Sequence, residues 1–239
     1  MSDIEHTARR RLAADEAALR RTPGGVTLGG TLRRFWRYPS PWMITAALVA
    51  TLAARVVVGD WRLGDLWGPV VLVALFPVLE WLIHVFVLHW RPREVAGITV
   101  DTLLARKHRE HHTDPRDVPL VFIPWRALIW VIVGYNALAL LAFPRVGQAL
   151  SFMLSVAVLG LLYEWTHYLI HSDYKPRTRA YKAVWRNHRL HHYKNEHYWF
   201  TVTSTATADR LFGTYPDPAT VETSPTAKNL HGSEERVTR

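Results

Sequence analysis

The sequence predicts an all-α integral membrane protein, in which a bundle of four membrane-spanning helices carries a histidine-rich helical cap. Two observations support this fold class. The chain of 239 residues holds four long apolar stretches, and each approaches the ~20 residues with which an α-helix crosses a bilayer. Thirteen histidines are present, and ten of them fall into four short groups beside these stretches. The length allows one domain with a core and leaves little room for a second.

Composition narrows the class further. The formal net charge is +9, and 49% of the residues are hydrophobic. A basic chain can bind nucleic acid or anionic lipid, and the apolar stretches favour lipid over nucleic acid. The chain has no cysteine, which excludes disulfides and thiolate metal sites. The first forty residues have no apolar run followed by a small-residue cleavage site, so we expect no secretory signal peptide.

The N-terminal segment, residues 1–41, is basic. Residues 2–21 are predicted to form a basic helix that ends at Thr22-Pro23-Gly24-Gly25. Residues 26–41 contain Arg33-Arg34-Phe35-Trp36-Arg37-Tyr38. Mixed arginine and aromatic residues are typical of a membrane-surface segment, and a solvated linker is the alternative.

Four apolar stretches follow, at residues 42–58, 66–90, 120–143 and 148–170. The first contains Arg55, whose long side chain could reach the membrane–water interface. The second and fourth are apolar except toward their C-terminal ends, where carboxylates and histidines occur. A soluble helical protein with buried helices is the alternative, and four such stretches in so short a chain argue against it.

The distribution of Lys and Arg predicts the orientation. The 59–65 and 144–147 links carry one basic residue each, whereas eight precede residue 42, six lie in 90–119 and eleven follow residue 171. Because basic loops stay in the cytoplasm, we expect a multi-pass protein with both termini and the 90–119 loop cytoplasmic. Residues 42–215 would form the membrane-embedded domain. Residues 216–239, rich in Pro, Thr, Ser and charge, are predicted to be a disordered polar tail.

The ten grouped histidines are predicted to lie on one side of the membrane. Two crossings separate the second group from the third, so the chain returns to the same face. Within the groups, spacings of three and four residues place imidazoles on one helix face. His84 and His89 are five apart, so either the helix is distorted there or the two serve different ions. The groups are His84 and His89; His108, His111 and His112; His167 and His171; and His188, His191 and His192.

This constellation predicts a dinuclear metal site. Ten imidazoles exceed the roughly four to six ligands of one transition-metal ion, so two ions sharing them is the simplest arrangement. Neutral nitrogen ligands suit iron, zinc, copper or nickel. Any single histidine could be structural, and it is the four chelating groups on one face that favour metal binding. His197 is a possible additional ligand or a pocket or surface residue.

Some polar residues near the groups are candidates to orient the ligands, because a ligating histidine usually donates its second ring N–H to a carboxylate or carbonyl. Each could instead be a cap or a surface residue. A glutamate within an apolar stretch is costly without a partner, which favours the first two. The candidates are Glu80, Glu164, Asn187, Asn195 and Asp209.

The order and spacing of the four histidine groups resemble the fatty acid hydroxylase superfamily, which includes sterol desaturase-type enzymes. The resemblance covers roughly residues 66–215. His191-His192-Tyr193-Lys194-Asn195, followed by Phe200-Thr201-Val202-Thr203-Ser204 and Leu211-Phe212-Gly213-Thr214, is most similar to the fatty acid (sphingolipid) 2-hydroxylases. Two features depart from that branch. The cytochrome b5 domain of eukaryotic members has no counterpart here, and Phe200-Thr201 stands where Phe-Gly is expected.

The resemblance implies a non-haem diiron monooxygenase that hydroxylates a lipid acyl chain with O2, and it assigns the ten histidines as ligands of two iron ions. Zinc is an alternative occupant. No dinucleotide fingerprint is visible, so the electrons are expected from a separate protein, for which the basic face suits an acidic donor. The same charge could instead only set topology and bind anionic lipid. Bacterial carotenoid hydroxylases show the same histidine spacing, so a carotenoid or sterol hydroxylase or a desaturase is the enzymatic alternative. A zinc-binding membrane protein is the non-enzymatic alternative.

Overall fold

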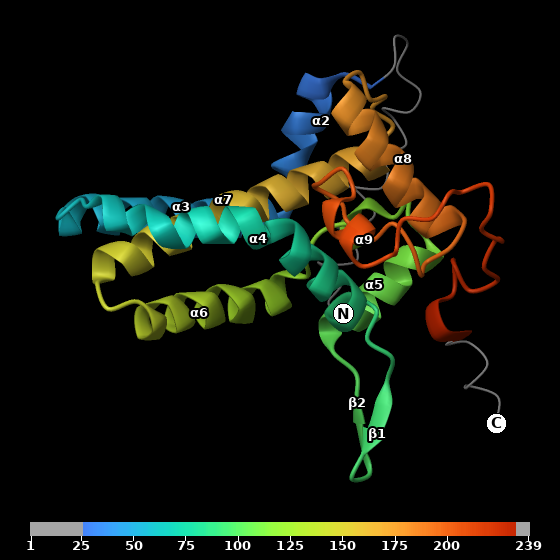
Figure 1. Cartoon of the computed structure of the whole chain (residues 1–239), viewed down its shortest axis with the longest axis horizontal. Helices are drawn as coiled ribbons and strands as arrows, with labels where there is room; N and C mark the ends of the chain where they lie inside the picture. Colours follow the sequence, from blue (N-terminus) through green and yellow to red (C-terminus); the bar gives the residue numbers. More distant parts are fainter. Residues whose placement is uncertain (1–25, 233–239) are drawn as a thin grey trace.

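The computed structural model describes residues 26–232 and is mostly helical. Four helical segments are long and apolar enough to cross a membrane: Pro39–Val58, Leu63–Leu88, Val118–Ala142 and Val146–His171. They lie side by side at one end of the molecule, and the remaining elements gather at the other end (Figure 1). The expected bundle with a helical cap is therefore confirmed. The basic helix predicted at residues 2–21 lies outside the described residues.

Helix α7 (Val146–His171) is the centre of the bundle and packs against α3 (Pro39–Val58), α4 (Trp67–Ile83) and α6 (Trp125–Ala142). Small and medium apolar side chains fill these contacts. Ile44, Leu128 and Ala157 are buried together where α3, α6 and α7 meet. Most other apolar side chains of the four helices face outward, which is the arrangement expected of helices that are surrounded by lipid.

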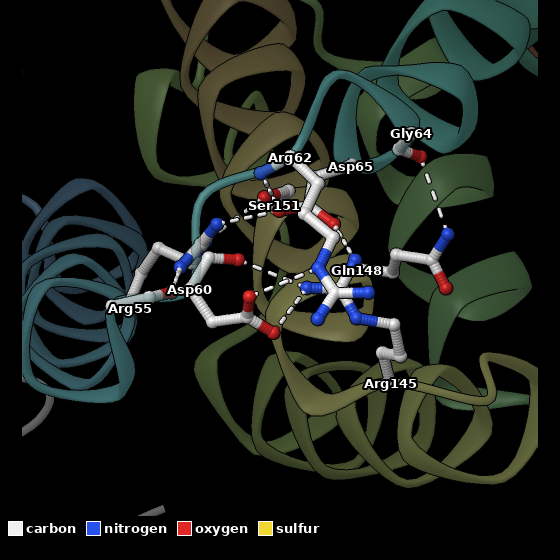
Figure 2. A network of polar contacts seen from close by, with 9 residues as sticks. Arg55, Asp60, Arg62, Gly64, Asp65, Arg145, Gln148 and Ser151 are labelled. Atoms are coloured by element: carbon white, nitrogen blue, oxygen red, sulfur yellow. Dashed lines mark hydrogen bonds and ion pairs between the residues drawn. The ribbon is translucent and has the colours of Figure 1, made fainter.

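A network of charged residues joins the two helix connections at the end of the bundle farthest from the cap (Figure 2). The guanidinium of Arg55 donates to the carboxylate of Asp65 at 2.6 Å, and both side chains are buried. Arg145 donates to the second oxygen of Asp65 at 2.7 Å and to Asp60 at 2.6 Å. Arg55 therefore pairs inside the protein, although its position in the first apolar stretch suggested that it would extend toward water.

The cap is built from short elements. The π-helix η2 (His84–Leu88) continues α4, and a hairpin of β1 (Arg93–Val95) and β2 (Ile98–Val100) follows it. Helices α5 (Leu103–Thr113), α8 (Arg179–Tyr193) and α9 (Thr207–Leu211) complete the cap, with single helical turns η3 (Val118–Leu120) and η4 (Leu230–Gly232) at connections. A further single turn, η1 (Leu63–Leu66), joins α3 to α4 at the opposite end of the bundle. The hydroxyls of Thr102 and Thr178 accept backbone N–H groups at the N-termini of α5 and α8. Such caps fix where these helices begin.

The described part of the N-terminal segment packs on the cap end of α7. Helix α2 (Leu28–Phe35) places Phe35 against Phe122 and Tyr168, and Tyr38 stacks on Phe122 with ring centroids 4.2 Å apart. Phe35 and Tyr38 are nearly fully buried. Residues 26–41 are thus attached to the core through their aromatic side chains.

The C-terminal segment differs from the sequence expectation. Composition predicted a disordered tail over 216–239, but residues 216–232 follow the surface of the cap, and Ala227 and Leu230 are buried. The backbone N–H of Ser224 donates to the carbonyl of Lys194 at 2.7 Å. The two buried apolar side chains and such backbone contacts hold a segment whose average composition is polar.

Candidate metal centre

The structure brings all ten grouped histidines together at the cap end of the bundle. They form two groups of five, and within each group the candidate ligand atoms lie within 4.8 Å of one another. Two adjacent sites are what a dinuclear centre requires. The first histidine group contains His84, His89, His108, His112 and His191, and the second contains His111, His167, His171, His188 and His192.

The two His-x-x-His-His motifs are each divided between the groups. On α5, His108 and His112 point to the first group and His111 to the second. On α8 the relation is reversed, because His188 and His192 belong to the second group and His191 to the first. With 3.6 residues per turn, the residue four positions along lies about 40° to one side of the first residue, and the residue three positions along lies about 60° to its other side. Each helix thereby contributes ligand candidates to both sites, so the position of one site fixes that of the other.

The spacing of His84 and His89 is explained by the π-helix at the end of α4. The backbone N–H of His89 donates to the carbonyl of His84 at 3.0 Å, a bond between residues five apart. This wider turn brings the two rings to a centroid distance of 5.0 Å, and both lie in the first group. Of the two interpretations that the sequence allowed, the distorted helix is the one observed, and it places both rings in one candidate group. Such π-turns are frequent at functional sites.

Backbone carbonyls orient several of the imidazoles. Nδ1 of His84 donates to Phe200 at 2.6 Å, and Nδ1 of His191 donates to Tyr198 at 2.8 Å. A carbonyl can only accept, so Nδ1 carries the proton in these rings, and Nε2 keeps a free lone pair. Two further rings are oriented in the same way: His112 by the carbonyl of Ala227 at 2.9 Å and His167 by that of Val121 at 2.8 Å.

The Nε2 atoms fit a metal better than they fit one another. Nε2 of His188 lies 3.1 Å from that of His167 and 3.0 Å from those of His171 and His192. One ring N–H cannot satisfy three such neighbours. Two nitrogens bound at about 2.1 Å to one ion and about 90° apart are separated by about 3.0 Å. Among the described residues, Nε2 is buried without a hydrogen-bond partner in four of these rings: His89, His111, His112 and His191.

Burial favours the neutral, metal-binding form of these rings. It lowers the pKa of His89, His108, His111, His112, His188 and His192 well below 6.5, and neighbouring imidazoles add to the effect. For His191, burial lowers the pKa to about 4. The rings are therefore neutral at pH 7, which is the state that coordinates a metal.

The predicted carboxylates do not contact the histidine rings but bind the backbone segments whose carbonyls orient them. Glu80 accepts the backbone N–H groups of Val202 and Thr203 at 2.8 and 2.9 Å. Asp209 accepts those of Phe200 and Thr201 at 2.8 and 3.0 Å. The two carboxylates thus hold the loop whose carbonyls orient His84 and His191.

Glu164 has the same relation to the second group. It accepts the backbone N–H of Ile123 at 2.9 Å, two residues beyond the carbonyl of Val121 that orients His167. The three carboxylates were sought as direct partners of ring N–H groups, Glu80 and Glu164 because they lie four and three residues before a histidine and Asp209 because it lies near the last group. Instead they fix the backbone that supplies the partner.

The remaining predicted residues lie near the groups in different ways. Asn187 is buried and accepts the hydroxyl of Tyr215 at 3.4 Å. Asn195 accepts the N–H of His197 at 3.0 Å and reaches the carbonyl of Glu222 at 3.4 Å, so it connects the end of α8 to the C-terminal segment. The His197 side chain is 68% exposed, pairs with Glu196 at 3.6 Å and lies outside both histidine groups.

Sequence reasoning missed the loop that presents the carbonyls. Trp199 is fully buried with a positive φ of 57°, an unusual conformation for a residue with a bulky side chain. Phe200 places its ring 5.2–5.5 Å from those of His84, His89 and His191 and forms an apolar wall beside the first group. The hydroxyl of Thr201, which replaces the expected glycine, donates to Asp209 at 2.5 Å. No side-chain pattern in the sequence marks a backbone carbonyl as an acceptor.

Comparisons with known proteins agree with this architecture. The fatty acid hydroxylase family model matches residues 69–214, more than half of the chain. A dihydroceramide fatty acyl 2-hydroxylase of Arabidopsis thaliana is 28% identical over 189 residues, which cover 76% of this chain and 73% of the relative. A fatty acid 2-hydroxylase of Macaca fascicularis is 30% identical over 144 residues, 59% of this chain and 37% of the relative.

The same architecture occurs in a solved structure. The visible hydroxylase domain of full-length scs7p superimposes with a TM-score of 0.60 at 20% identity, covering 80% of this chain and 69% of the other. At this identity the likeness concerns the fold. The family match over residues 69–214 shows that the chain belongs to the fatty acid hydroxylase family.

Proposed function

We propose that this protein is a membrane-bound, O2-dependent hydroxylase of a lipid acyl chain, of the fatty acid 2-hydroxylase type. The observation that carries the proposal is the pair of five-histidine groups at one end of four membrane-spanning helices. The relatives named as acyl 2-hydroxylases support the substrate class. A carotenoid or sterol hydroxylase or desaturase is the alternative within the same superfamily.

The ten histidines would hold two iron ions, which supply O2 reduction and C–H oxidation when bound. Consumption of O2, two electrons and two protons, with insertion of one oxygen atom into a C–H bond and release of the other as water, balances the reaction. The protein's own part is orientation and exclusion of water. Carbonyls from the 198–200 loop set two rings of the first group, and the Phe200 ring shields that group.

The basic side of the cap is proposed to receive the electron donor. Along α8 and the segment before it, the side chains of Lys175, Arg177, Arg179, Lys182 and Arg186 are exposed. A cationic surface steers an acidic protein into contact and accelerates association. By the distribution of Lys and Arg, this surface, the histidine groups and both termini would be cytoplasmic. Residues 42–215 would be the catalytic membrane domain, with residues 1–41 at the membrane surface.

Lipid analysis in a bacterial host tests the proposal. The wild type, a His191→Ala/His192→Ala double variant and a His197→Ala variant are expressed, and total lipids are compared by mass spectrometry. The double variant removes one ring from each group, whereas His197 lies outside both. We expect acyl species with one added oxygen in the wild type and in His197→Ala, and none in the double variant.

Metal content and electron supply make a negative result informative. If iron-loaded protein, given a chemical reductant and O2, leaves every lipid unchanged, the acyl hydroxylase proposal is wrong. A hydroxylated carotenoid or sterol would move the assignment to the alternative substrates. Protein that binds only zinc and shows no redox response would identify a zinc-binding membrane protein.

A further inference from the structure

The β1–β2 hairpin is an exposed projection of the cap that the proposed reaction does not use. It begins five residues after the second membrane span ends at Leu88. From there it extends sideways, away from the long axis of the four helices (Figure 1). Its turn is Ala96-Gly97, with positive φ values of 51° and 78° at the two residues. Two positive φ values at a two-residue connection are typical of a tight hairpin turn that matches strand twist.

The two faces of the hairpin differ in polarity. Residues paired across antiparallel strands share a face, and the pairs are Arg93 with Val100, Glu94 with Thr99, and Val95 with Ile98. One face therefore carries the three branched apolar residues and Arg93. The opposite face carries Glu94 and Thr99, whose side chains hydrogen bond to each other. Val95, Ile98 and Val100 are 55%, 68% and 37% exposed.

The base of the hairpin is attached to the metal-binding helix α5. The indole N–H of Trp90 donates to the carbonyl of Val100 at 3.2 Å. Arg109 donates to the carbonyl of Trp90 at 3.2 Å and to the carboxylate of Asp101 at 2.6 Å, and the Arg109 and Asp101 side chains are largely buried. Arg109 directly follows the ligand candidate His108. The position of the hairpin is thus tied to that of the histidine groups.

The charges of the hairpin and its position at the end of a membrane span favour a lipid surface as the partner of its apolar face. The Arg93 guanidinium lies 5.0 Å from the Trp90 ring centroid, and Arg91 is exposed beside it. Tryptophan with arginine at the end of a membrane span is typical of the interface with anionic headgroups. The single carboxylate of the hairpin, Glu94, lies on the other face. An acidic surface of a soluble partner would match Arg93 but not the three apolar residues.

We propose that the β1–β2 hairpin is a membrane-surface anchor. It lies in the headgroup region of the leaflet nearest the histidine groups, with Val95 and Ile98 toward the acyl chains and Glu94 toward water. Through Trp90 and Arg109 it would hold α5, and with it the metal centre, at a fixed depth above the bilayer. The proposal requires only that the four helices span a membrane, and it is independent of the reaction catalysed.

Single-cysteine labelling tests the anchor directly, because the chain contains no cysteine. Val95→Cys and Ile98→Cys place an environment-sensitive fluorophore on the apolar face, and Glu94→Cys and Thr99→Cys are matched controls on the polar face. The full chain is reconstituted in vesicles containing anionic phospholipid. Quenching by brominated lipid reports contact with the bilayer, and quenching by iodide reports contact with water.

We expect blue-shifted emission and stronger brominated-lipid quenching for labels at 95 and 98, and stronger iodide quenching for labels at 94 and 99. Equal iodide quenching at all four positions would place the hairpin in solvent and overturn the proposal. Labels at 95 and 98 that neither quencher reaches would also overturn it, because they would indicate a protein contact such as a second copy of the chain. The readout is position, so loss of activity cannot mimic either result.

Discussion

The carboxylate of Glu80 accepts a hydrogen bond from the hydroxyl of Thr203 at 2.8 Å, although 123 residues separate the two in the sequence. Glu80 lies four residues before His84 on α4, and Thr203 lies three residues after Phe200, whose carbonyl orients His84. The contact therefore joins α4, which carries His84, to the loop whose carbonyl orients the His84 ring. It makes the geometry of the first histidine group depend on a buried carboxylate that does not itself touch a histidine in this structure.

Replacing Thr203 with Val should loosen that connection without changing side-chain volume much. The loss of one hydrogen bond, with a carboxylate oxygen left less satisfied, should destabilise the protein by about 1–3 kcal/mol. We expect a lower thermal unfolding midpoint in detergent and reduced metal retention. Thr205→Val is the matched control, since Thr205 is exposed, and an equal effect of both substitutions would contradict the role assigned to Glu80.

Glu80→Ala should have a larger effect than Thr203→Val. Two backbone N–H groups, of Val202 and Thr203, lose their acceptor in addition to the hydroxyl, and buried unsatisfied donors cost about 1–3 kcal/mol each. Glu80→Gln keeps one carbonyl acceptor and should retain part of the metal. Metal content by mass spectrometry, normalised to folded protein, should rank wild type above Gln and Gln above Ala. The same metal content in Gln and Ala variants would show that the backbone contacts do not hold the site.

The sequence allowed the bundle to be predicted because membrane insertion depends on composition. The four apolar stretches agree with the observed spans to within a few residues, and the two-crossing argument correctly placed all ten histidines at one end. What it could not predict depends on backbone geometry. The π-turn at His84, the division of each His-x-x-His-His motif between two groups, and the carbonyl partners all follow from how helices meet in three dimensions.

Two cap features were missed for a different reason. The hairpin at residues 93–100 is short, and Ala96-Gly97 is a weaker turn signal than Asn-Gly or Asp-Gly, so the all-α prediction omitted it. The segment 216–232 was predicted as disordered from its average polarity, yet a few side chains determine its placement. Leu230 is 1% exposed, and Thr226 donates to the buried Glu196 at 2.5 Å.

Removing one histidine from either group should affect metal binding in a group-specific way. His89→Ala takes a ring from the first group and His171→Ala a ring from the second. We expect each variant to hold the ion of its own group more weakly and to release it first to a chelator, because that group keeps four rings while the other keeps all five. Wild-type metal release from either variant would remove that histidine from the ligand set. His197→Ala, with its exposed side chain, should bind as much metal as the wild type.

Arg55 should matter for stability rather than for the metal centre. Arg55→Ala leaves the buried Asp65 with Arg145 as its remaining arginine partner (Figure 2), so we expect a cost above about 1 kcal/mol but below the about 3–5 kcal/mol of a buried charge left unpaired. Arg62→Ala, which removes an exposed side chain paired with exposed Asp60, should change stability by no more than about 1 kcal/mol. Thermal unfolding of both variants in detergent checks this difference. Equal midpoints would mean that the network contributes little.

Truncation should reveal whether the C-terminal segment supports the first histidine group. A chain that ends at Glu222 loses the Ala227 carbonyl, which accepts Nδ1–H of His112 at 2.9 Å, and the buried Leu230. Loss of an orienting partner typically lowers metal affinity by about 10–100-fold. A chain that ends at Gly232 keeps both contacts and is the matched control. We expect the shorter chain to release metal to a chelator faster than the control, with wild-type-like secondary structure by circular dichroism. Identical metal release from both truncated chains would show that His112 does not need the Ala227 carbonyl. Residues 223–232 would then have no role in metal binding.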